Sequence, residues 1–347
     1  MIQANTQAES SSAVAAPRQL KAVGLISGGL DSLLAACIVK DLGVEVYGVY
    51  FAMPWGCCNK TKAIEVSMKL GIKFITFQLD ERYLEMIKNP RYGRGTALNP
   101  CVDCRIHMFS RAGEYMRHIG ADFVFTGEVL GQRPMSQLRR SMSQIEEGAG
   151  LRGLLLRPLC ARLFEPTIPE QEGWIDRQKL LRIAGRSRKE QIHLADQFQI
   201  SGYNQPGGGC LLTDSHFSRR MQDTLDHGYR NFRETVALQW GRHFRINRDF
   251  KVVLGRDAEE NESLIRYAHR DDYVMQLVEG NGPTVILKGN NPPGEILQTA
   301  AGLIQRFSKF RNEPPRDIRY WRHGQKKDVC HLRARILEEA EIEKILI

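Results

Sequence analysis

Short apolar runs that favour β-strands alternate with amphipathic helical stretches between Lys21 and Thr126, and this alternation constrains the fold most strongly. The run KAVGLIS precedes the helical stretch SLLAACIVKDL, and VEVYGVYF, IKFITFQL and ADFVFTG are further strand candidates. Strands that alternate with helices indicate a parallel sheet with helices on both faces. The sequence therefore predicts an α/β fold with a doubly wound parallel sheet, in which ligands bind beyond the carboxyl ends of the strands.

A glycine-rich turn, SGGLDS, joins the first predicted strand over Val23–Ile26 to the helix that follows it. Glycine lets the backbone approach an anion closely, and the amides at a helix N-terminus point their partial positive charge at it. The hydroxyls of Ser27 and Ser32 can donate to phosphate oxygens, and Asp31 can cap the helix or help to hold a divalent cation. The turn lacks the lysine of a Walker A loop. It predicts a phosphate site, although a strand-to-helix turn can also need glycines and an Asp for structure alone.

Three cysteines form the second chemical signal. Cys101 and Cys104 stand in NPCVDCRIHMF with two residues between them, and Cys210 follows three glycines. Such a pair can share a metal or a cluster, or exchange a disulfide, and a third thiol can complete a site. Zinc is less attractive, because no second pair stands at ligand spacing. Three thiols leave one iron of a cubane open, and unrelated reduced thiols are the alternative. Cys57 and Cys58, after the second strand, are a minor alternative for sulfur handling.

The turn SGGLDS resembles the SGGxDS signature of the PP-loop ATP pyrophosphatases. That resemblance implies cleavage of ATP between the α and β phosphates, with an adenylate formed on an oxygen of the acceptor. The segment NPCVDCRIHMF resembles the NPCxxCNxxIKF segment of bacterial tRNA 2-thiouridylases, TGE at 126–128 resembles their strand end TGHYA, and GGGCLLTD is similar to the segment with their second catalytic cysteine. The sequence departs from that family at Glu128, where the family has His, and at Arg105, where it has Asn.

The resemblance implies a role for each matching residue. It assigns catalysis to Cys210, Cys101 and Asp31, a 4Fe-4S cluster or persulfide chemistry to Cys101, Cys104 and Cys210, and contacts with MgATP to Ser27, Gly28, Gly29, Asp31, Ser32, Thr126 and Gly127.

Later segments resemble a ThiI-like group of PP-loop proteins related to tRNA thiolation, and KVVLGRDAEENESLI and GPTVILKG resemble the NFACT-R domain of RNA-binding quality-control factors. We therefore expect a disordered tail over 1–18, a PP-loop domain over 19–225 and an NFACT-R-like α/β domain over 226–347 with an RNA-binding or accessory role. In the stretch before the third cysteine, Asp176 and Ser187 are candidate N-caps of two short helices.

The charge balance favours a polyanionic partner. The chain has 49 Lys and Arg against 40 Asp and Glu, a net charge of +9, and a basic protein is drawn to nucleic acid by counterion release. The sequence contains no run of eighteen uncharged apolar residues, which a membrane span would require. The start of the chain lacks the pattern of a signal peptide. Eight irregularly spaced cysteines then predict reduced thiols and a cytoplasmic protein.

These patterns together predict a tRNA thiolase that uses ATP and Mg²⁺, adenylates a uridine carbonyl and replaces its oxygen with sulfur. The sulfur donor would be sulfide or a persulfide carrier such as a cysteine desulfurase. A homodimer of the protein is compatible with this function. One alternative is a PP-loop ligase or amidotransferase that adenylates a small-molecule carboxylate. Another is a nucleotide-regulated RNA-binding protein without transfer activity.

Overall fold

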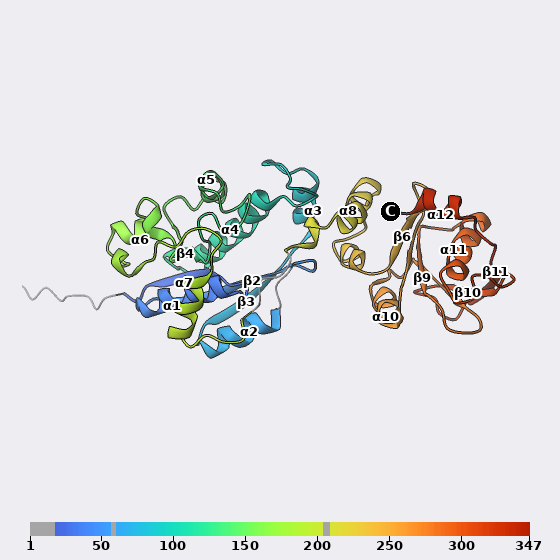
Figure 1. The fold of residues 1–347 in the computed structure, drawn as a ribbon, viewed down its shortest axis with the longest axis horizontal. Coiled ribbons are helices and arrows are strands. Elements are labelled where there is room, and N and C mark those ends of the chain that lie inside the picture. The colour runs from blue at the N-terminus through green and yellow to red at the C-terminus, as the bar shows by residue number, and fades with distance from the viewer. Residues whose placement is uncertain (1–17, 57–59, 204–208) are drawn as a thin grey trace, which may run out of the picture. The chain divides into compact units, whose positions relative to one another are not determined.

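The computed structural model describes residues 18–56, 60–203 and 209–347 (Figure 1). The chain divides into two compact units. The first comprises Met1–Tyr50, Lys60–Ile75 and Phe109–Tyr203, and the second comprises 51–59, 76–108 and 204–347. Cys57 and Cys58, and the expected tail up to residue 17, lie outside the described residues.

The first sheet has the strand order β3-β2-β1-β4-β5. Its strands are β1 (Lys21–Leu25), β2 (Glu45–Ala52), β3 (Lys73–Gln78), β4 (Phe123–Thr126) and β5 (Leu155–Leu156). Strand β1 pairs in parallel with both β2 and β4, and β4 pairs in parallel with β5. The predicted parallel α/β sheet is confirmed, and the chain changes direction across the sheet at β1, where such folds bind ligands.

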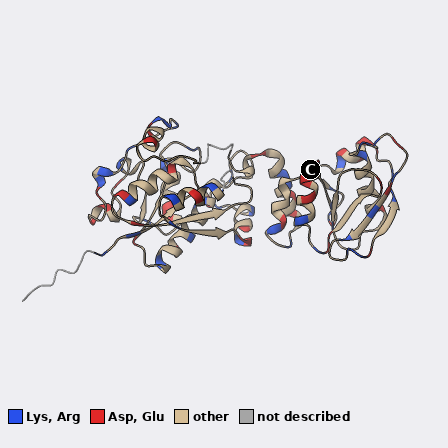
Figure 2. Ribbon diagram, turned by 90° about the horizontal axis from the view of Figure 1, so that it is seen from below, with Lys and Arg blue, Asp and Glu red and all other residues tan. Residues whose placement is uncertain are grey.

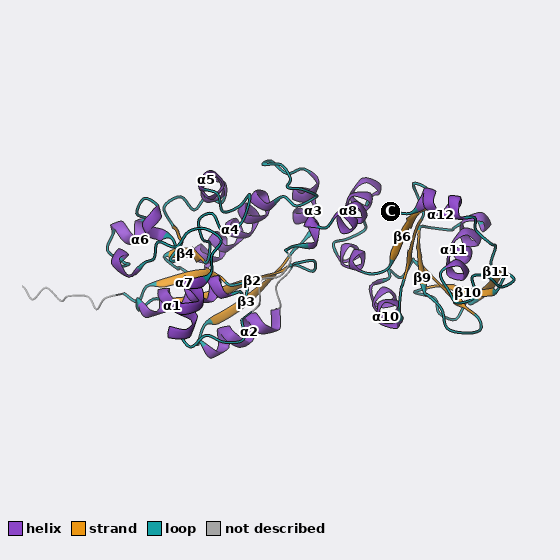
Figure 3. Ribbon diagram, in the orientation of Figure 1, coloured by secondary structure: helices purple, strands orange, loops and turns teal. Residues whose placement is uncertain are grey.

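Helices cover this sheet (Figure 3). They are α1 (Leu30–Asp41), α2 (Lys60–Lys69), α4 (Cys101–His118), α5 (Arg139–Gly148), α6 (Ile168–Gln171) and α7 (Lys189–Gln197), with 3-10 turns η1 (Ala161–Leu163) and η2 (Arg177–Lys179). Helix α1 is buried on every side from Ser32 to Val39, because it carries no charged residue between Asp31 and Lys40. Its leucines pack with Phe123 and Phe125 of β4 in one apolar cluster.

The second sheet is antiparallel, in the order β11-β10-β8-β9-β7-β6. It consists of β6 (Arg242–Arg245), β7 (Lys251–Leu254), β8 (Tyr273–Leu277), β9 (Val285–Lys288), β10 (Asp317–Arg322) and β11 (Cys330–Arg333), with helices α10 (Ala258–Tyr267), α11 (Gly294–Arg306) and α12 (Glu339–Ile345). Val252 and Leu254 of β7 point into one apolar cluster and Val253 into another, so both faces of the sheet are covered. The smaller α/β module that the sequence predicts at the C-terminal end is confirmed.

The rest of the second unit gathers around an apolar cluster that includes Trp55, Tyr83, Ile87, Phe217 and Met221. It contains α3 (Glu81–Lys88), the start of α4, η3 (Leu211–Thr213), α8 (Ser215–His227), α9 (Arg233–Val236) and η4 (Ala237–Gln239). Within the described ranges, no helix is both long and apolar enough to cross a membrane.

Candidate active site

The turn after β1 leaves the start of α1 open to an anion. Gly28 has a φ of 78°, and Gly29 is the N-cap residue in extended conformation, without a side-chain capping bond. The Ser32 hydroxyl donates to the Gly29 carbonyl at 2.8 Å and lies 3.4 Å from the hydroxyl of Ser27. Uncapped amides at a helix N-terminus form an anion site. The local geometry therefore suits the phosphate contacts that the sequence predicts for residues 27–32.

Asp31 does not cap α1, so that alternative is wrong. Its Oδ2 accepts a hydrogen bond from Gln132 Nε2 at 2.7 Å, and Gln132 Oε1 accepts one from Gln191 Nε2 at 3.0 Å. The other carboxylate oxygen, Oδ1, is buried and has no hydrogen-bond partner among the described residues. A buried, unpartnered carboxylate oxygen beside a phosphate turn fits the ligand preference of Mg²⁺. No motif or spacing in the sequence predicted a role for Gln132 or Gln191.

Thr126 and Gly127 close the site from the neighbouring strand. Thr126 is the last residue of β4 and is 2% exposed. A Cβ atom added to Gly127 would lie 2.4 Å from the carbonyl oxygen of Asp31 and 2.5 Å from the amide nitrogen of Ser32. Only glycine fits this contact, which brings together all the residues predicted to bind ATP.

Replacing Gly127 by Ala is therefore expected to push β4 away from the turn. Overpacking of this kind costs about 1–3 kcal/mol, and the shift should also weaken ATP binding. Urea denaturation and equilibrium dialysis with ATP measure the two effects. Gly294→Ala is the matched control, because no atom lies within 4 Å of the Cβ that it would add. Equal ATP affinity in the two variants would contradict the close contact.

Glu128, the departure from the thiouridylase pattern, has a structural partner. It is 2% exposed, and its Oε2 lies 3.2 Å from Arg157 Nε. Arg157 also bonds Glu146 Oε2 at 2.8 Å and the Met142 carbonyl at 3.0 Å. The carbonyl of Glu128 accepts a bond from the thiol of Cys160. Burial raises the pKa of Cys160 to about 11, so this thiol is an inert core group, as the sequence indicates.

A tyrosine and a methionine in mutual contact connect two of the three predicted cysteines. Cys104 Sγ lies 3.1 Å from the hydroxyl of Tyr83, which is 3.9 Å from Met53 Sδ. Cys210 Sγ lies 3.8 Å from the same Met53 sulfur. Cys101 Sγ accepts a hydrogen bond from Asn99 Nδ2 at 3.2 Å. Burial, and then Cys104, raise the pKa of Tyr83, and Cys210 and Cys101 also contribute to that shift. The structure thus links Cys104 to Cys210 through Tyr83 and Met53 and places Cys101 beside Asn99.

Backbone contacts bring these thiols together from distant segments. The Leu211 amide donates to the Trp55 carbonyl at 2.9 Å, and the Leu98 amide donates to the Leu212 carbonyl at 3.1 Å. The buried carboxylate of Asp103 accepts bonds from the amides of residues 91 and 92 and so fixes the loop before α4. No motif or spacing in the sequence predicted that Tyr83 and Met53 would contact the thiols.

The thiols, as they lie, do not form the ligand set that an iron–sulfur cluster needs. In the described part of the chain, no three His, Cys, Asp or Glu side chains are arranged to hold a metal ion. Burial raises the pKa of Cys104, against the lowering effect of Tyr83, and metal ligation requires thiolates. The cluster on Cys101, Cys104 and Cys210 therefore stays a prediction.

Two family models match separate parts of the chain. Residues 20–146 match the tRNA methyl transferase HUP domain, and residues 241–345 match the NFACT protein RNA binding domain. The tRNA-specific 2-thiouridylase MnmA of Mycobacterium ulcerans (strain Agy99) is 32% identical over 142 residues, 36% of this chain and 39% of that protein. Its counterpart in Mycobacterium tuberculosis (strain ATCC 25618 / H37Rv) is 34% identical over 142 residues, 36% and 38% of the two chains. The chain thus spans about two-fifths of the length of these curated relatives.

Solved structures give weaker likenesses. A 4-thiouridine synthetase–RNA complex with bound ATP has a TM-score of 0.38 and 20% identity, covering 59% of this chain and 50% of that one. The U34-tRNA thiolase NcsA from Methanococcus maripaludis, with its 4Fe-4S cluster, has a TM-score of 0.32 and 14% identity, covering 60% and 73%. The sequence matches and the phosphate turn therefore make residues 20–146 similar to the PP-loop part of tRNA thiolation proteins, and residues 241–345 similar to the NFACT protein RNA binding domain.

Proposed function

We propose that the chain is an ATP-dependent tRNA sulfurtransferase that adenylates a uridine carbonyl and replaces its oxygen with sulfur. The observation that carries the proposal is the phosphate turn, closed by Gly127 and fitted with a buried, unpartnered oxygen of Asp31. The contacts of Cys104 with Tyr83 and of Cys210 with Met53, and the 32% identity over 142 residues to a tRNA 2-thiouridylase, support the sulfur chemistry.

In the adenylation step, the amides of the turn and the hydroxyls of Ser27 and Ser32 hold the phosphates of ATP. Asp31 would hold Mg²⁺, which neutralises charge on the phosphates when bound. The uridine carbonyl oxygen attacks the α phosphorus, the bond to the β phosphate breaks, and pyrophosphate leaves. The carbonyl oxygen, now joined to AMP, has become a good leaving group.

In the sulfur step, a persulfide on Cys210 or Cys101 attacks the activated carbon, and AMP leaves with the oxygen. The second of these cysteines then attacks the first, which releases the thiolated base and leaves a Cys101–Cys210 disulfide. External thiols reduce that disulfide, and a persulfide carrier such as a cysteine desulfurase then transfers its outer sulfur to the freed thiol. If sulfide is the donor, it attacks the Cys101–Cys210 disulfide directly, which leaves a persulfide on one cysteine and a thiol on the other. Cys104 suits neither role, because burial keeps its thiol protonated.

The module within 226–347 is proposed to contact the RNA. Figure 2 shows Lys and Arg on both units, in line with the net charge of +9. Such charge strengthens binding to any RNA and makes it depend on salt. Specific activity then has to come from the ATP and thiol sites.

The adenylation step is tested by release of pyrophosphate. We expect the protein to form AMP and pyrophosphate from ATP only when tRNA is present. Asp31→Asn should lower this rate by about 10²-fold or more, because it removes charge stabilisation at the reacting phosphates. Asp41→Asn, at the exposed C-terminal end of α1, is the matched control. A pure RNA-binding protein would release no pyrophosphate, and a carboxylate ligase would not need tRNA.

A further inference from the structure

The second unit contains a pocket of about 750 Å³ that the sulfur and adenylation chemistry does not use. It lies between the start of α3 and the segment from residue 231 to 240, with Tyr267 at the end of α10. A volume of this size holds a small organic ligand such as a nucleotide. Its lining combines aromatic rings with carboxylate, amide and guanidinium groups.

One wall of the pocket is aromatic. The rings of Trp240 and Tyr267 have centroids 5.2 Å apart, with 36° between their planes, and both side chains are half-buried. The guanidinium of Arg233 lies 5.3 Å from the Tyr267 ring. Phe232 packs its ring against the buried Trp55 at 5.3 Å and so forms the base of the wall. Half-exposed aromatic rings offer a stacking surface to a planar ring such as a nucleobase.

The start of α3 contributes two carboxylates to the lining of the pocket. Asp80 caps α3 by accepting from the Arg82 amide at 3.1 Å, and Glu81 Oε1 accepts from the Phe232 amide at 3.1 Å. The other oxygen of Asp80 lies 3.4 Å from Arg82 Nε, so both of its oxygens have protein partners. A carboxylate has about four acceptor positions, and Glu81 therefore keeps capacity for a ligand. Carboxylates select a ligand edge with N–H donors and repel phosphate. Guanine, alone among the four RNA bases, has two adjacent N–H groups, N1–H and N2–H, on its Watson–Crick edge.

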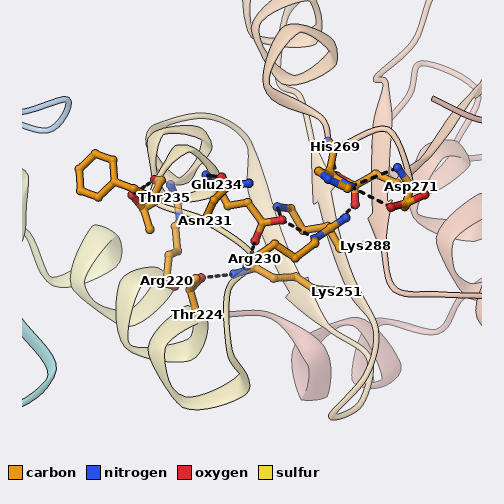
Figure 4. A network of polar contacts seen from close by, with 12 residues as sticks. Arg220, Thr224, Arg230, Asn231, Glu234, Thr235, Lys251, His269, Asp271 and Lys288 are labelled. Carbon is orange, nitrogen blue, oxygen red and sulfur yellow. Dashed lines mark hydrogen bonds and ion pairs between the residues drawn. The ribbon is translucent and has the colours of Figure 1, made fainter. Parts of the chain in front are cut away.

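A network of polar contacts fixes the segment that carries the aromatic wall (Figure 4). Arg230 pairs with Asp272 and with Glu234, and Lys288 of β9 lies 3.8 Å from the same Glu234. The Thr235 hydroxyl donates to the Phe232 carbonyl at 2.7 Å. These bonds attach the segment to the second sheet, so the pocket is formed before a ligand arrives, which lowers the entropy cost of binding.

We propose that this pocket binds an unpaired guanine nucleotide of the RNA substrate. The base stacks on Trp240, its N–H edge donates to the carboxylate of Glu81, and Arg233, which lies over the Tyr267 ring, contacts the backbone phosphate. The inference rests on the proposed tRNA function for its source of guanine. A free guanine nucleotide has the same chemistry.

Equilibrium dialysis of the full chain with labelled 5′-GMP tests the pocket, with a non-hydrolysable ATP analogue present in excess to fill the phosphate turn. We expect GMP to bind at least about tenfold more tightly than AMP or UMP, from the paired N–H contacts. Trp240→Leu should weaken GMP binding about tenfold or more by removing the stacking surface. The matched control is Trp174→Leu, a half-buried tryptophan of the first unit that does not line the pocket.

A second variant guards against misfolding. Glu81→Gln keeps an acceptor oxygen for the Phe232 amide but loses the charge, and it should also weaken GMP binding about tenfold. A G-containing hexanucleotide should bind in preference to a uridine hexamer. Absence of saturable GMP binding below millimolar concentration, or equal affinity in Trp240→Leu and Trp174→Leu, would overturn the proposal and leave the pocket to a protein segment. Binding of GMP without preference for the G-containing hexamer would overturn the assignment to RNA.

Failure of the pocket and failure of the sulfurtransferase function are separable. Cys210→Ser should keep full GMP affinity, because Cys210 does not line the pocket. Thiolation by the wild type without any GMP binding would contradict the guanine pocket and leave the proposed sulfurtransferase function standing. GMP binding without thiolation would contradict the proposed sulfurtransferase function and leave the guanine pocket standing.

Discussion

Replacing Cys210 by Ser is expected to lower tRNA thiolation by about 10³-fold or more, because a hydroxyl can neither carry persulfide sulfur nor form the disulfide that releases it. The same variant should retain tRNA-dependent pyrophosphate release, since the phosphate turn contains no cysteine. Mass spectrometry of tRNA nucleosides from a deletion strain that expresses each variant measures the first effect. A pyrophosphate assay on the purified proteins measures the second.

The matched control for Cys210 is Cys330→Ser. Cys330 is an exposed cysteine on β11 and has no place in the proposed chemistry. We expect wild-type thionucleosides from it. Unchanged thionucleosides in Cys210→Ser would exclude the thiol mechanism. Failure of the wild type itself to restore any thionucleoside, with pyrophosphate release unaffected by Cys210→Ser, would favour an amidating or ligating enzyme, for which these cysteines are dispensable.

Arg157→Leu is expected to lower the free energy of unfolding by about 3–5 kcal/mol, because it leaves the carboxylate of Glu128 buried without its partner. Both side chains are at most 5% exposed. The double variant with Glu128→Leu as well should recover part of the loss, since it removes the unpaired charge. Urea denaturation followed by circular dichroism gives the three free energies.

An exposed ion pair serves as the control for Arg157. Arg306 and Glu339 pair on the surface, where their side chains are 32% and 61% exposed. Arg306→Leu should change the free energy of unfolding by about 1 kcal/mol at most. If Arg157→Leu changes the free energy of unfolding as little as Arg306→Leu does, the buried carboxylate of Glu128 does not need that arginine for stability. Its burial after β4 would then need another explanation.

The first sheet and the phosphate turn could be predicted because their signals are local. Strand and helix periodicity places β1, β2 and β4 almost residue by residue, and the position of SGGLDS after the first strand assigns it to the ligand edge. Asp176 caps the turn that follows it, as expected. The N-cap of α7 is Arg188 and not Ser187, because that helix begins one residue later than its hydroxyl signal suggests.

The surroundings of the thiols could not be predicted, because they depend on contacts between distant segments. Tyr83 lies on α3 and Met53 follows β2, and neither stands at a fixed spacing from Cys104 or Cys210. Gln132 reaches Asp31 across a separation of 101 residues in the chain. Side chains of this kind have ordinary types in ordinary loops, and only tertiary packing gives them a place in the site.

The burial of α1 on every side has a consequence for nucleotide affinity. Because packing of the whole helix, and no side-chain cap, holds its first turn in place, the amides there are already oriented when the protein is empty. The binding free energy of ATP is then not reduced by the entropy cost of ordering a loop. A change that loosens the far end of this helix would reduce affinity for ATP without altering a single group that touches it.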